Sequence, residues 1–120
     1  MAHYVTGFVV AVPKSKKKQY VNMARKVARV WREHGALAVW ECWGVDVKPG
    51  KVTSFPQAVK LKRGEVVVLS WAVYKSKASH DRVMATAMKD PRLADMMDPK
   101  KMPFDGKRMF WGGFKTIIEA

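Results

Sequence analysis

Two short apolar runs dominate the pattern of hydrophobic and polar positions along the chain. The first is Glu65–Tyr74, in which most residues are β-branched or aromatic and only Glu65 is charged. A short run of this kind, bounded by Gly64 and Lys75, predicts a strand that is buried on both faces in the middle of a sheet. Residues 4–12 have the same character, which predicts a second central strand.

Two other segments show the spacing of amphipathic helices. After Ser15, which we expect to cap the first helix, apolar residues recur at helical spacing up to Glu33, and Gly35 is well suited to end the helix. A second helix is predicted for residues 77–89, and a short third helix for residues 92–97. The residues of the first helix expected to face the sheet are Tyr20, Met23, Ala24, Val27 and Trp31.

Residues 36–44 and 109–118 are predicted to form the two remaining strands. In the first of these, the alternation of side chains places Trp40 on one face and Glu41 on the other. A long connection precedes the apolar run at residue 65 and is expected to contain a short strand at 51–54 or 58–61. Near the C-terminus, Gly112-Gly113 predicts a bend or bulge in the last strand.

The resulting order, βαββαβ, is typical of an α+β fold with a ferredoxin-like sheet. We expect a single domain over residues 1–120, with the two apolar strands in the centre and the helices on one sheet face only. Because both side-chain sets of the central strands are apolar, the other face needs a cover. The simplest cover is a second copy of the chain, which predicts a homodimer whose sheets pack face to face.

Composition adds two constraints to this architecture. The single cysteine, Cys42, excludes an internal disulfide. No signal peptide is visible and no segment approaches the roughly 20 apolar residues that cross a bilayer, so we expect a cytoplasmic protein with no membrane partner. The formal net charge is +13, and a balance of this size indicates attraction to polyanions without indicating a fold.

Several motifs occur together along nearly the whole chain. They are Gly7-Phe8-Val9, Trp31–Ala36, Lys51–Pro56, Asp90–Leu93, Met102–Met109 and Gly112-Gly113-Phe114. Together they resemble the YbaA-like family of small bacterial proteins, a domain of unknown function. The resemblance implies a dimeric α+β barrel and no established activity. The wider superfamily includes cofactor-independent monooxygenases, isomerases, haem-binding peroxidases and small-molecule sensors. The resemblance to these proteins is one of fold and does not imply their activities.

The tryptophans provide the first functional hypothesis. Trp31, Trp40, Trp43 and Trp71 are expected to approach one another between helices and sheet, where they would line a site for a small apolar or aromatic molecule. The alternative is that tryptophan simply fills the core and the dimer interface. The candidate ligand-binding residues are Trp31, His34, Glu41, Trp43, Trp71 and Arg108.

A second hypothesis is sequence-indifferent binding of nucleic acid or another polyanion. Residues 14–32 contain eight basic residues and no acid, and such a surface binds phosphates with an affinity that falls as salt rises. The alternative is a solvated helix face that keeps the protein soluble. The candidate polyanion-binding residues are Lys16, Lys17, Lys18, Arg25, Arg29 and Arg32.

A third hypothesis is an enzyme that resembles the cofactor-independent monooxygenases or isomerases, with His34 as the first choice of base. No His or Cys pair has metal-ligand spacing, so we expect neither a metal nor a cofactor. Cys42 lies in the middle of a strand and is interpreted as an unreactive thiol. We interpret Asp105–Arg108 as a turn in which Asp105 or Asp98 pairs with Arg108.

Overall fold

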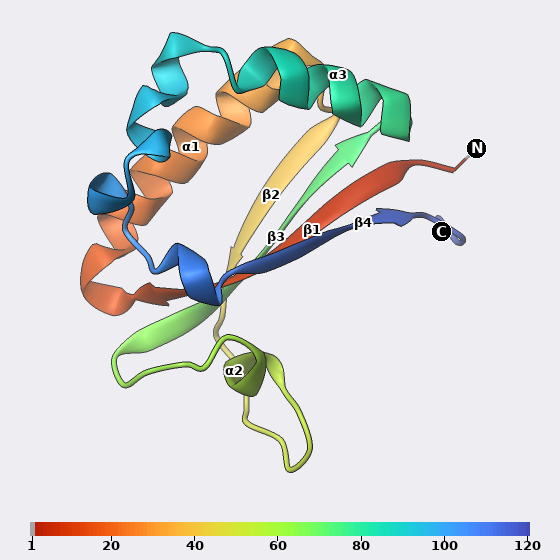
Figure 1. Cartoon of the computed structure of the whole chain (residues 1–120). Coiled ribbons are helices and arrows are strands. Elements are labelled where there is room, and N and C mark those ends of the chain that lie inside the picture. The colour runs from red at the N-terminus through yellow and green to blue at the C-terminus, as the bar shows by residue number, and fades with distance from the viewer. Residues whose placement is uncertain (1) are drawn as a thin grey trace.

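A four-stranded antiparallel sheet, in the order β2-β3-β1-β4, forms the centre of the structure (Figure 1). The computed structural model describes residues 2–120, apart from the side chains of residues 95–97. The strands are β1 Tyr4–Pro13, β2 Ala38–Trp43, β3 Glu65–Tyr74 and β4 Phe110–Lys115. The two apolar strands occupy the centre, which confirms the predicted α+β, ferredoxin-like sheet.

Two helices pack against one face of this sheet, also as predicted (Figure 1). The helices are α1 Lys17–His34, α2 Phe55–Ala58 and α3 Lys77–Ala87, of which α1 and α3 cover the sheet. Short 3-10 segments complete the chain: η1 Lys14–Lys16, η2 Pro91–Met97, η3 Pro99–Lys101 and η4 Gly106–Arg108. None of the helices described over residues 2–120 is long and apolar enough to cross a membrane.

The ends of α1 differ in how well the sequence predicts them. The expected cap at Ser15 is wrong, because Ser15 lies within η1 and the capping position of α1 is Lys16, which makes no side-chain cap. The other end is as expected, since Gly35 has a φ of 125° and its N–H bonds to the carbonyl of Arg32. This left-handed conformation favours glycine and ends the helix.

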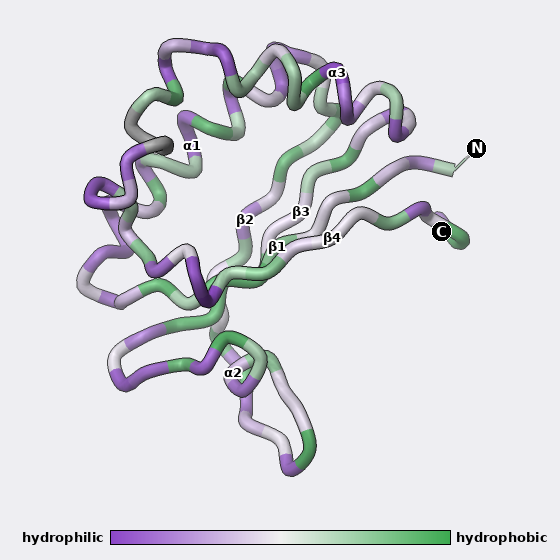
Figure 2. The backbone as a smooth tube through the Cα atoms, viewed as in Figure 1, coloured by the Kyte–Doolittle hydropathy of each residue, from purple (hydrophilic) through white to green (hydrophobic). Residues whose placement is uncertain are grey.

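Side chains alternate between the two faces of the sheet, and the buried clusters identify which face the helices cover. Val10 and Val12 of β1 and Val68 of β3 pack against Tyr20 and Ala24 of α1. Further along the same face, a second cluster joins α1, α3 and η2. It consists of Val30, Ala36, Ala72, Tyr74, Val83, Ala87 and Leu93. Figure 2 shows the matching mixture of hydrophobic and hydrophilic residues along α1.

The opposite face is covered in part by the chain itself, which differs from the expectation that a second copy alone would cover it. Val9 and Ala11 of β1 and Val67 of β3 pack against Val59, which lies in the connection between β2 and β3. This connection contains α2, and the predicted short strand is absent from it in the described structure. The chain therefore covers one end of the face and leaves the rest open.

Candidate functional site: a cleft between α1 and β2

A cleft of about 290 Å³ lies between α1 and the edge strand β2. Its walls are mostly apolar, because the side of α1 next to the strand presents small or aliphatic residues at helical spacing. Its lining residues are Lys17, Tyr20, Val21, Ala24, Arg25, Ala28, Val39, Glu41, Cys42, Trp43 and Val68. The volume is close to the lower end of the range for small-molecule sites, about 300 Å³.

A carboxylate and a phenol meet inside this cleft. The Tyr20 hydroxyl donates a hydrogen bond of 2.6 Å to Oε1 of Glu41. Although Glu41 belongs to an edge strand and is exposed as a residue, the apolar surroundings of its carboxylate raise its pKa above the usual value, while the bond from Tyr20 lowers it. Burial and the neighbouring carboxylate also raise the pKa of Tyr20. Because the raised pKa of Tyr20 keeps its phenol protonated, Tyr20 is the donor of this bond and Glu41 the acceptor.

The mouth of the cleft is positively charged. Nζ of Lys17 lies 4.9 Å from the centroid of the Trp43 ring, within the range of a cation–π contact. Arg25 lines the same cleft and is exposed. The cleft thus combines an aromatic wall, a partly buried acceptor and two cations at its edge.

The structure places only two of the six predicted ligand-binding residues in this cleft, Glu41 and Trp43. Trp31 packs instead against the cluster under α3, and its Nε1–H donates a 2.9 Å bond to the Tyr74 hydroxyl. His34 lies at the end of α1, where its Nε2 is 3.1 Å from Oδ2 of Asp90.

The expectation that all four tryptophans approach one another between helices and sheet is wrong for Trp40 and Trp71. These two residues are directly opposite in the β2–β3 register and their rings stack at 5.7 Å. Trp71 shares the face of Val67, which packs under the connection. The pair therefore lies on the sheet face that the helices do not cover.

Arg108 also lies away from the cleft. Its guanidinium holds both carboxylate oxygens of Glu65 at 2.8 and 2.7 Å and bonds to Asp105 at 3.2 Å. The pairing with Asp105 agrees with the interpretation of residues 105–108 as a turn, here the short segment η4. Among the described residues, no group of three potential ligands could hold a metal ion.

Tyr20 is the polar residue of this cleft that the sequence analysis assigned only to the core. The signal was present in the sequence, because Tyr20, Ala24 and Ala28 recur at intervals of four on one side of α1. What the sequence lacked was the lateral placement of β2 beside this side of the helix, which brings Glu41 under the hydroxyl.

The predicted polyanion-binding residues are spread around α1. Lys17 and Arg25 line the cleft, whereas Arg25 and Arg29 line a second hollow on the other side of the helix. Arg32 donates a hydrogen bond to the carbonyl of Leu37. Lys16 and Lys18 are exposed near the start of the helix.

Comparison with known proteins places this geometry in context. A family model described as "Protein of unknown function (DUF1428)" matches residues 3–106. The uncharacterized protein YbaA of Escherichia coli K12 is 51% identical over 116 residues, which are 97% of each chain, and that of Shigella flexneri is equally similar. A solved dimeric ferredoxin-like protein from an uncultured marine organism aligns over 98% of this chain and 99% of its own. Its TM-score is 0.53 and its identity 14%, a likeness of fold alone.

Proposed function

We propose that this chain, which belongs to the DUF1428 family of proteins of unknown function, binds a small apolar or aromatic molecule. The binding site is the cleft between α1 and β2. The observation that carries this proposal is the hydrogen-bonded pair of Tyr20 and Glu41 inside an otherwise apolar cleft. Such a combination, apolar walls with a few placed polar groups, is typical of small-molecule sites.

The chemistry of the cleft defines the ligand more closely. Val39, Ala24 and the Trp43 ring offer an apolar surface to a flat or aliphatic body. Glu41 receives one bond from Tyr20, and a carboxylate can accept several. A neutral aromatic molecule that carries one hydroxyl or amine donor matches both features.

We further propose that the protein is a homodimer whose sheets pack face to face. The sheet face left open by the helices carries no charged side chain between Val67 and Val73 of β3 or between Val5 and Ala11 of β1. Its exposed large side chains include Trp40 at 59%, Leu69 at 38%, Phe110 at 45% and Phe114 at 62%. Contiguous apolar surfaces of this kind are typical of interfaces. The ferredoxin-like structural neighbour is described as dimeric, which supports the dimeric state proposed for this chain.

The cleft can be tested with 1-naphthol, a neutral aromatic molecule with one hydroxyl, by saturation-transfer difference NMR. The native chain is expected to transfer saturation to the naphthol ring protons. Ala28→Trp should abolish the transfer, because Ala28 lines the cleft and an indole there occupies its volume. Ala85→Trp provides the matched control, since Ala85 is an exposed position of α3 outside the cleft.

The two variants also separate specific from general binding. Equal loss of transfer in both, or equal retention in both, would contradict the cleft as the binding site. Naphthol bound to the open sheet face would show saturation transfer in both variants, because neither substitution lies on that face.

A further inference from the structure

A second hollow, of about 390 Å³, lies on the side of α1 that faces away from β2. It is formed by the side of α1 that adjoins η2 and by the start of η2. Its lining residues are Asn22, Arg25, Lys26, Arg29, Val30 and Arg92. The residues from α1 recur at intervals of three and four, so they form one face of the helix. Val30 is fully buried and forms the apolar floor of the hollow.

The cations of α1 in this hollow have no carboxylate bonded directly to them among the described residues. In the described part of the chain, Arg25, Lys26 and Arg29 form no ion pair, and the segment from Lys14 to Arg32 contains no acid. All three are exposed at the hollow. The neighbouring carboxylates, Glu33 and Asp90, bond to Arg92, and the charge of Arg29 acts on Glu33 without an ion pair between them.

The fourth cation, Arg92, comes from another element and is already held in position. Its Nη2 lies 2.8 Å from Oδ2 of Asp90 and 2.6 Å from Oε2 of Glu33, and its Nε lies 3.0 Å from Oδ1 of Asp90. His34 also contacts Asp90. These bonds fix the plane of the guanidinium, so little side-chain freedom remains to be lost when an anion binds.

Charge balance indicates the kind of anion. Four cations line the hollow, and Asp90 and Glu33 offset two of them. The excess of two positive charges matches a doubly charged phosphate, and the Asn22 amide adds a neutral donor. Because cations from two elements converge on one hollow, a compact anion fits better than an extended strand, whose phosphates would need a linear track.

We therefore propose that the hollow between α1 and η2 binds the phosphate group of a small phosphate monoester. This site is distinct from the cleft between α1 and β2, with which it shares only Arg25. Binding of a phosphate monoester would account for the excess of basic residues on α1.

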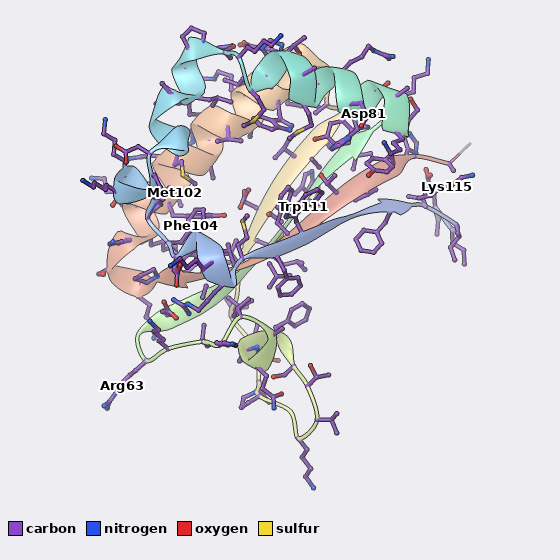
Figure 3. The ribbon with its side chains drawn as sticks, viewed as in Figure 1. Arg63, Asp81, Met102, Phe104, Trp111 and Lys115 are labelled. Carbon is purple, nitrogen blue, oxygen red and sulfur yellow. The ribbon has the colours of Figure 1, made fainter. Side chains whose placement is uncertain are left out.

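The test is a titration of ¹⁵N-labelled protein with phenyl phosphate at constant ionic strength, followed by the amide shifts of α1 and η2. Saturable shifts that centre on these two elements are expected. Arg29→Gln and Lys26→Gln should each weaken binding about tenfold, because each removes one cation and its charge-assisted hydrogen bond to the phosphate. Arg63→Gln is the matched control: it removes one exposed cation from the turn before β3, where the side chain points away from the molecule (Figure 3).

Three results would overturn the proposal. Shifts that do not saturate, or equal weakening by Arg63→Gln, would show only diffuse attraction to a basic protein. Tight binding of a single-stranded oligonucleotide, with a steep salt dependence and no response to phenyl phosphate, would instead identify a polyanion surface. Ala28→Trp, which fills the cleft, should leave the phenyl phosphate titration unchanged, so failure at one site is distinguishable from failure at the other.

Discussion

Glu41 is a carboxylate whose surroundings favour its neutral form. The apolar wall of the cleft raises its pKa above 4.5, and the bond from Tyr20 opposes this rise only in part. A group with a raised pKa stabilises the fold fully below its unfolded pKa and loses that contribution as the pH rises through its folded pKa. Ionisation of the Glu41 carboxylate therefore lowers the stability of the fold.

Replacing this carboxylate by an amide should change how stability depends on pH. We expect the free energy of unfolding of Glu41→Gln, relative to the native chain, to increase between about pH 4 and about pH 7, because only the native chain ionises there. Urea unfolding at the two pH values measures this difference. Glu33→Gln is a control of opposite sign, since Arg92 lowers the pKa of Glu33. A difference between Glu41→Gln and the native chain that does not vary with pH would contradict the prediction.

At the scale of single residues, the sequence shows which side chains share a face of the sheet but not which face the helices cover. The alternation in β2 correctly places Trp40 and Glu41 on opposite faces. It cannot tell which face the helices cover, because both side-chain sets of β1 and β3 are apolar. Packing decides the question: Val68 contacts α1 whereas Val67 contacts the connection. Because of this one ambiguity, the predicted site included Trp40 and Trp71, two of its four tryptophans, which lie on the other face.

Among the elements, the connection between β2 and β3 depends on one side chain outside it. Arg108 of η4 donates to the carbonyls of Val59 and Lys60 at 3.3 and 3.1 Å and binds Glu65 through two bonds. The side chains of Arg108 and Glu65 are only 12% and 8% exposed. Arg108 thereby ties the end of the connection, the start of β3 and η4 together.

Removal of this guanidinium should loosen the connection before it unfolds the sheet. Arg108→Ala is expected to lower the free energy of unfolding by about 3 kcal/mol, the usual loss when one partner of a buried ion pair is removed. Hydrogen exchange followed by mass spectrometry should show faster exchange over residues 55–64 than over β1. Lys107→Ala, at the neighbouring exposed position, should change neither quantity. Uniform acceleration across the sheet in Arg108→Ala would contradict this role.

The elements that the sequence failed to predict are short and are fixed by distant contacts. The four residues of α2 are too few for helical periodicity, although Ser54 does cap them by accepting a bond from Gln57 N–H. The predicted bulge at Gly112-Gly113 is wrong, because both glycines pair in regular register with β1. A Cβ at Gly113 would collide with the Tyr4 hydroxyl, so this glycine makes room for a ring rather than for a bend.

At the scale of the whole molecule, the open sheet face leads to a prediction about assembly. In the proposed dimer, Trp40→Glu places a charge in the interface and should convert the dimer to a monomer, as measured by sedimentation equilibrium. Trp111→Glu is the matched control, because Trp111 is 61% exposed but stacks on Phe8 at the other face of the sheet. A native chain that sediments as a monomer at micromolar concentration would contradict the dimer, and so would equal dissociation of both variants.

The position of β1 between β3 and β4 has a consequence for biosynthesis. Tyr4 pairs with Tyr74 on one side and with Lys115 on the other, so β1 gains its second neighbour only when β4, about 100 residues later in the sequence, has been made. At typical elongation rates this interval is roughly 5 to 20 seconds. Over that time one edge of this strongly apolar strand has no partner. Pairing between strands so far apart in sequence is slow, so β1 remains an edge strand until β4 joins it.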